Sequence, residues 1–243
     1  MHTPSANELL NIWERGHGSS WARRGLLLLT AAYAETDEQA LARWSIGRRD
    51  ASLLDLWEKT FGPRLQSVVA CPGCTARLEF DVTVANIRVP MSEEPGCLDL
   101  RLGSYAVKVR LPNSDDLEGL VPTMSMDAAM SYLIEQCTIK ALHKEEEIAP
   151  ADLPQEVKET LSAAMEEQDG QGNVQLRLNC PGCRHEWQAT FDIVSFFWSE
   201  IHSWAVRLLT EVHALASAYG WREADILAMT PIRRQLYLEM QGT

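Results

Sequence analysis

Two copies of one four-residue motif carry the clearest chemistry in this sequence: Cys71-Pro72-Gly73-Cys74 and Cys180-Pro181-Gly182-Cys183. A Cys-x-x-Cys turn directs two thiolates toward one point, and two such turns supply the four sulfur ligands of a tetrahedral structural zinc. We therefore predict that the four cysteines of these motifs bind one Zn²⁺. Because the four ligands leave no coordination position for water, the predicted role of the metal is structural and not catalytic.

Two other chemistries use the same thiols. A disulfide within each motif is disfavoured, because the polar start of the chain lacks a signal-peptide core and so indicates a reducing compartment. A redox-active Cys-x-x-Cys also normally begins a helix, whereas these motifs lie between strand-like segments. Iron in a rubredoxin-like site has the same four-sulfur geometry, and the sequence leaves it open beside zinc.

The other cysteines and the histidines lack the spacing of metal ligands. Cys97 and Cys137 are interpreted as buried or spectator thiols, since free cysteine often behaves as a small hydrophobe. His185 follows the second motif closely and is the weaker alternative ligand. His202 and His213 share a predicted helix but are too far apart to form a ligand pair, so we expect them on its surface or in satisfied core positions.

Recognised catalytic motifs are absent from the sequence. It contains no His-Glu-x-x-His, no phosphate-binding glycine loop, no Gly-x-Ser-x-Gly and no dinucleotide fingerprint. The acidic runs at 115–116 and 145–147 are interpreted as solvated surface or helix caps. We therefore predict a protein that is not an enzyme.

Composition narrows the class of protein and of partner. Hydrophobic residues make up 46% of the 243 residues, enough to bury a sizeable core. The formal net charge of −12 disfavours binding to a nucleic-acid backbone. The apolar run from Gly25 to Tyr33 is too short to cross a bilayer. We expect a globular cytoplasmic protein with neither a nucleic-acid nor a membrane partner.

The residue patterns around the motifs predict an α+β fold. Alternating apolar and polar residues on both sides of each motif predict two strand-knuckle-strand hairpins, which we expect to pair into a zinc-ribbon-like β core. Four short helices are expected before them, and their start and stop residues are Ser5, Gly16, Trp21, Tyr33, Thr36 (with Gln39), Arg48 and Phe61-Gly62.

The segment between the hairpins predicts a mixed lobe. We expect a hairpin turned at Gly103-Ser104, a helix capped at Ser114, a helix from Ser125 to Cys137, an exposed linker over 144–152 and a polar helix from Pro154 to Gln168. After the second hairpin, Asp192 is predicted to cap a long helix that ends at Gly220. Two short helices, Glu223–Met229 and Pro231–Met240, complete the chain.

These elements divide the chain into five predicted regions. They are an N-terminal helical region (1–64), a first zinc-knuckle hairpin (65–84), an inserted mixed α/β lobe (85–172), a second zinc-knuckle hairpin (173–192) and a C-terminal helical region (193–243).

The sequence contains three arginine pairs, Arg23-Arg24, Arg48-Arg49 and Arg233-Arg234. We interpret them first as ion-pair partners for the excess carboxylates. The alternative is a partner surface that uses Trp44, Trp221 and Tyr237 as anchors.

A family resemblance lies in the residues that flank the two motifs. The first stretch runs from Ile46-Gly47-Arg48-Arg49-Asp50 through Leu53-Leu54 and Phe61-Gly62 to Leu78-Glu79-Phe80. The second runs from Leu178-Asn179-Cys180-Pro181 through His185, Trp187, Phe191-Asp192-Ile193 and Trp198 to Tyr219-Gly220-Trp221, Ala224-Asp225-Ile226-Leu227, Arg233-Arg234 and Tyr237-Leu238. In this order they resemble the baseplate hub assembly chaperone family of T-even-like contractile phages and related contractile injection systems.

The resemblance implies a non-enzymatic protein that assists, or becomes part of, the hub of a contractile-tail baseplate during its construction in the bacterial cytoplasm. Its implied partners are baseplate or hub proteins, and its second implied location is the assembled particle. The competing hypothesis from the residues is a zinc-ribbon adaptor in a nucleic-acid process, which the acidic net charge disfavours.

Overall fold

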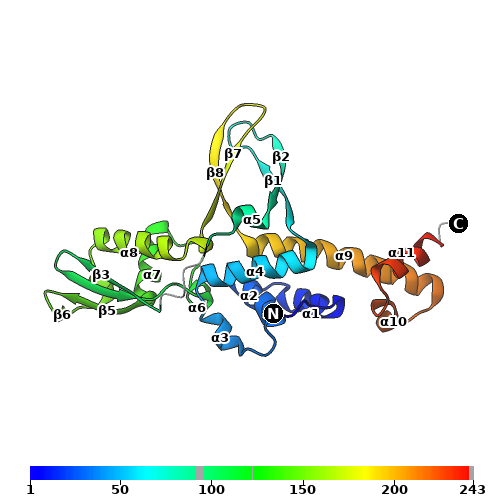
Figure 1. Ribbon diagram of the computed structural model, residues 1–243, viewed down its shortest axis with the longest axis horizontal. Coiled ribbons are helices and arrows are strands. Elements are labelled where there is room, and N and C mark those ends of the chain that lie inside the picture. Colours follow the sequence, from blue (N-terminus) through cyan, green and yellow to red (C-terminus); the bar gives the residue numbers. More distant parts are fainter. Residues whose placement is uncertain (91–95, 122, 241–243) are drawn as a thin grey trace.

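A computed structural model describes residues 1–90, 96–121 and 123–240, which form a helical body, a hairpin arm, an inserted lobe and a C-terminal extension made of the second half of α9 with α10 and α11 (Figure 1). The helical body consists of α1 to α4 and the first half of α9. The hairpin arm consists of β1, β2, β7 and β8 and projects from this body. The inserted lobe, made of β3 to β6 with α6 to α8, lies beside the body on the side opposite the chain's C-terminus. The mixed α+β class predicted from the sequence is confirmed.

Side-chain caps determine where the body helices begin. Serines precede three of them, and each serine hydroxyl accepts a hydrogen bond from a backbone N–H of the first turn. The third helix is capped by Asp37 and not by Thr36 as expected, because the Asp37 carboxylate accepts from two backbone N–H groups. The helices are α1 (Ala6–Gly16), α2 (Trp21–Ala32), α3 (Glu38–Ala42) and α4 (Ile46–Phe61).

The long helix α9 (Ile193–Tyr219) crosses the body and extends beyond it (Figure 1). Asp192 caps its start as predicted, and Gly220 ends it in the left-handed conformation with φ of 68°. Its buried stripe joins the main core, where Phe197 and Ile201 are fully buried beside leucines of α2 and α4. Two short helices, α10 (Glu223–Leu227) and α11 (Pro231–Glu239), pack against its far end.

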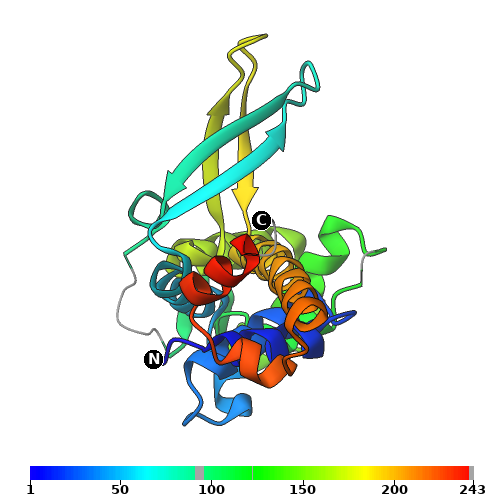
Figure 2. The same cartoon turned by 90° about the vertical axis from the view of Figure 1, so that its right-hand side faces the viewer.

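Both Cys-x-x-Cys motifs form the turns of β-hairpins, as predicted. Each hairpin is a separate two-stranded antiparallel sheet, so the expectation that they pair into one sheet is wrong. The hairpins cross instead (Figure 2), and apolar side chains from both, such as Phe80 and Leu176, line a shared hollow between them. The elements are β1 (Arg64–Ala70), β2 (Arg77–Thr83), β7 (Val174–Asn179) and β8 (Glu186–Phe191), with the one-turn helix α5 (Val84–Ile87) after β2.

The inserted lobe contains a four-stranded antiparallel sheet in the order β3-β4-β5-β6. The first hairpin turns at Gly103-Ser104 as predicted. The expected linker over 144–152 is wrong: Lys144 and Glu145 form a tight turn with positive φ, after which the chain pairs again with the strand before it. The strands are β3 (Leu98–Leu102), β4 (Tyr105–Val109), β5 (Thr138–His143) and β6 (Glu146–Glu147).

Helices of the lobe bury a second hydrophobic core against this sheet. Leu161 and Ile134 are buried in it beside Val109 of the sheet. The helix predicted after Ser114 is capped by Asn113, which makes a capping box with Asp116. The helical elements are α6 (Ser114–Glu118), α7 (Met126–Cys137), α8 (Gln155–Gln168) and the short 3-10 turns η1 (Pro150–Asp152) and η2 (Gly170–Gly172).

A search of the described helices finds none whose length and apolar character would let it span a bilayer.

Candidate metal centre

The four cysteines of the two motifs meet at the tip of the hairpin arm. Their sulfur atoms all lie within 4.8 Å of one another. The shortest approaches join the two hairpins, with 3.6 Å between the sulfurs of Cys71 and Cys183 and 3.6 Å between those of Cys74 and Cys180. A Zn–S bond of about 2.3 Å places the sulfurs of a regular tetrahedral site about 3.8 Å apart. The four thiols therefore fit a tetrahedral metal with only small adjustment.

The two turns repeat one backbone geometry. In the first, the Cys71 N–H donates to Ala76 at 2.9 Å and the Thr75 N–H donates to the Cys71 carbonyl at 2.8 Å. In the second, the N–H of Cys180 donates to His185 at 2.9 Å and that of Arg184 donates to the Cys180 carbonyl at 2.8 Å. The residue after each motif has a left-handed φ, 59° at Thr75 and 62° at Arg184. This shared geometry is what directs each pair of thiols toward one point.

Burial and charge differ between the two cysteines of each turn. Cys71 and Cys180 are buried, whereas Cys74 and Cys183 are exposed. The pKa of the Cys180 thiol is lowered to about 6, chiefly because the Cys183 backbone N–H donates to its sulfur. The pKa of Cys183 is raised to about 12 despite a hydrogen bond from the His185 backbone, because desolvation and the three neighbouring sulfurs oppose a second negative charge. A bound cation would relieve this repulsion and allow all four sulfurs to ionise.

The arrangement suits a structural metal. Four sulfurs at tetrahedral spacing occupy every coordination position, so such a site has no open position at which a substrate or water could be activated. Among the described residues, these four cysteines are the one group of possible ligands that the structure gathers together. The arrangement can therefore cross-link two hairpins whose cysteines lie as far as 112 residues apart in the chain.

Of the other sequence candidates, the two remaining cysteines lie in the inserted lobe and His185 lies beside the cluster without belonging to it. Cys97 is half-buried in the lobe. Cys137 is buried there, and desolvation raises its pKa to about 12, which suits an unreactive thiol. His185 stacks on Trp187 and lies beside Gly73, where an added Cβ would be 3.1 Å from the Cβ of His185.

The two histidines of α9 are far from forming a ligand pair. The Nδ1 atom of His202 accepts a hydrogen bond of 3.0 Å from Nε1 of Trp13 in α1. His213 lies exposed farther along the helix. Their predicted surface position is confirmed.

One arginine of each pair forms an ion pair within the chain, and the other lies over an aromatic ring. Arg49 is fully buried in the body, and its Nε donates to Asp50 at 2.7 Å. Its guanidinium lies 4.4 Å from the ring centre of Trp21. Arg234 is also buried and donates to Glu211 at 2.8 Å. No local pattern indicates that Arg49 is a core residue, because the burial of its side chain is determined by helices that pack from elsewhere in the chain.

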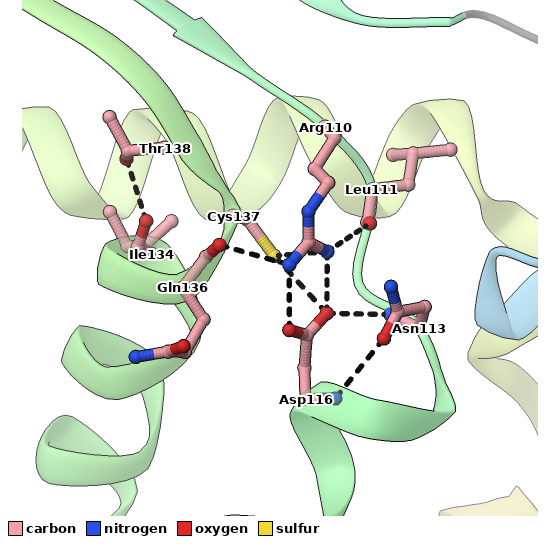
Figure 3. Close-up of polar contacts among 8 residues, drawn as sticks. All are labelled: Arg110, Leu111, Asn113, Asp116, Ile134, Gln136, Cys137 and Thr138. Atoms are coloured by element: carbon pink, nitrogen blue, oxygen red, sulfur yellow. Dashed lines mark hydrogen bonds and ion pairs between the residues drawn. The ribbon is translucent and has the colours of Figure 1, made fainter. Parts of the chain in front are cut away.

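A second polar cluster, missed by the sequence reasoning, holds the inserted lobe together (Figure 3). Arg110 donates from both terminal nitrogens to the Asp116 carboxylate, at 2.6 and 2.7 Å, and also reaches the carbonyl of Gln136 at 3.0 Å. The same carboxylate accepts the backbone N–H of Asn113 at 2.9 Å. One bidentate pair thereby ties the end of β4 to α6 and α7. Because every partner is internal, this cluster is structural.

A third cluster connects the lobe to the body. Asp169, just after α8, accepts hydrogen bonds of 2.8 Å from the Ser45 hydroxyl and from the Gly47 backbone N–H at the start of α4. Burial raises the pKa of this carboxyl group. A side chain at Gly47 would overlap the Asp169 carboxylate, so the close approach requires glycine.

The comparisons with known proteins gave one family. A family model described as T4 bacteriophage base plate protein matches residues 26–198. No significant match was found among curated proteins or among solved structures. The matched span runs from α2 into α9 and contains the inserted lobe and both Cys-x-x-Cys turns.

Proposed function

We propose, from the premise that the chain belongs to the family of T4 bacteriophage base plate proteins, that it is a non-enzymatic assembly chaperone or structural component of the hub of a contractile-tail baseplate. The observation that carries the proposal is the extent of the family match, which covers the arm, the lobe and, in the body, α3, α4 and parts of α2 and α9. Its proposed partners are other baseplate or hub proteins of a phage tail or of a phage-tail-like injection system. We place its synthesis in the cytoplasm and allow for its incorporation into the assembled particle.

We further propose that Cys71, Cys74, Cys180 and Cys183 bind one structural Zn²⁺. The sulfur spacing and the two identical turns support this choice. Iron would fit the same four sulfurs, and metal analysis of protein purified without chelators separates the two. Zinc at about one equivalent supports the proposal, and iron in its place or the absence of both metals contradicts it.

A partner of the protein type is favoured over nucleic acid. The net charge of −12 repels a phosphate backbone. Several arginines that would have to contact phosphates are already paired with carboxylates of the same chain, as in the Arg49–Asp50 and Arg234–Glu211 pairs. The acidic net charge and these ion pairs of the described residues therefore disfavour the adaptor hypothesis.

Affinity capture with defined partners tests the proposed function. The tagged chain is co-expressed with hub proteins of a contractile-tail baseplate, and the purified complexes are examined by size-exclusion chromatography with mass determination. A stable complex with a hub protein is expected. A folded, metal-loaded chain that joins none of them would contradict the proposal. Mass spectrometry of finished particles then separates the two forms of it, since a chaperone leaves the particle and a component stays.

A further inference from the structure

An apolar groove runs between the helical body and the inserted lobe. It has a volume of about 450 Å³. The body contributes Trp21 and Ile46, and the lobe contributes side chains of α6, α7 and α8. Its location places it far from the cysteine cluster at the tip of the arm (Figure 1). The groove is therefore a second surface, separate from the candidate metal centre.

Helix α7 presents an apolar stripe to this groove. The stripe consists of Met126, Ala129, Met130 and Leu133, which follow the i, i+3, i+4, i+7 spacing of one helix face. Met126 is 85% exposed, so most of this apolar side chain faces solvent in the free protein. Methionine is flexible and polarisable, which suits a surface that must fit an apolar partner.

The charges of the groove have a single sign. The charged residues found among its lining are Glu166 and Asp169, and both are acidic. The elements that border it carry further carboxylates, including Glu118 at the end of α6 and Asp127 in α7. Basic side chains of a partner would therefore be attracted to the rim while its apolar side chains fill the groove.

We propose that this groove binds an amphipathic helix of a partner protein, with an apolar face for the methionine stripe and lysine or arginine beside it. A helix laid in a groove inserts side chains at the same i, i+3, i+4, i+7 spacing that α7 presents. The inference rests on the proposed function only for the identity of the partner as a baseplate protein. The chemistry of the groove stands independently of that identity.

A synthetic peptide probe tests the groove directly. The probe is a leucine–lysine amphipathic helix of about five turns, measured by fluorescence anisotropy against the full chain and compared with a leucine–glutamate peptide of the same pattern. Met126→Lys with Met130→Lys places two charges in the groove. Ile139→Lys with Val68→Lys places the same two charges on exposed apolar positions outside the groove lining and serves as the matched control. Circular dichroism and thermal unfolding check that both variants are folded.

The leucine–lysine peptide is expected to bind the native chain and to bind the groove variant at least about tenfold more weakly, since each buried methionine side chain contributes that much or more. The matched control should retain the native affinity. Equal weakening in both variants, or equal binding of the leucine–glutamate peptide, would overturn the inference. If the native chain assembles with hub proteins but does not bind the leucine–lysine peptide, the groove proposal is wrong and the proposed function stands. Failure of the native chain to assemble contradicts the proposed function alone.

Discussion

Replacing Cys71 with serine should destabilise the protein by removing the proposed metal cross-link between the two hairpins. If one metal joins all four sulfurs, it closes chain segments of 112 and 106 residues between the cysteines that face each other. The loop-closure relation for a cross-link of this length gives about 5 kcal/mol at 25 °C. The bases of the hairpins are also held in the main core by Leu65 and Val174, so the arm is anchored without the metal. We therefore expect a loss of about 2–5 kcal/mol.

Urea unfolding, followed by circular dichroism, measures this loss. The buried serine hydroxyl has a cost of its own, so the decisive comparison uses a chelator. Chelation should lower the free energy of unfolding of the native chain toward that of Cys71→Ser, and it should leave the variant unchanged. Cys97→Ser, whose thiol lies outside the cluster, is the matched control and should change the stability by less than about 0.5 kcal/mol. If the chelator does not change the free energy of unfolding of the native chain, the reasoning is refuted.

Three further predictions concern single residues. Burial raises the pKa of Asp50 from 3.8 to about 6, so its contribution to stability is present below about pH 4 and is lost as the pH rises through 6. Urea unfolding of the native chain and of Asp50→Asn between pH 4 and 7 measures this loss, which should be about 3 kcal/mol. If the difference in the free energy of unfolding between the two proteins does not change with pH, the prediction is wrong. Gly16→Ala should cost about 1–3 kcal/mol because its Cβ would overlap the Trp198 ring, whereas Gly96→Ala, with open space around it, should be close to neutral in thermal unfolding. Thr75→Gly should stabilise the metal-loaded chain by roughly 1 kcal/mol in the same assay, because a β-branched residue at φ of 59° is strained; a loss would show that the threonine side chain is needed there.

Elements with strong local patterns could be predicted from the sequence. The long helix α9 has a capping Asp192, a continuous apolar stripe and a terminal Gly220, and each of these acts within a few residues of its own position. The two Cys-x-x-Cys turns were found for the same reason. Their meeting was inferred from chemistry, since two half-sites of one metal must come together whatever the fold between them.

Features that depend on distant contacts could not be read in this way. The hairpins cross without pairing their strands because their relative placement is set at the body, where Leu65 and Val174 enter the core. The turn at Lys144 and Glu145 was not predicted, because solvated charged side chains are equally compatible with an exposed linker and with a tight turn. Arg49 lies in the core with the adjacent Asp50 as its ion-pair partner and the indole ring of Trp21 from α2 over its guanidinium, and no local pattern indicates that a ring from another helix will cover it.

The location of the cysteine cluster explains why a metal is useful in this protein. An isolated two-stranded hairpin is only marginally stable in water, and this arm contains two of them with few buried residues beyond their bases. The main core holds the hairpins at one end, and a metal at the tip would hold them at the other. An arm fixed at both ends would keep its shape at a distance from the body, which would suit contact with the proposed baseplate partners. The proposed metal therefore acts on assembly through the rigidity of the arm, while the groove beside α7 offers a separate surface for a partner helix.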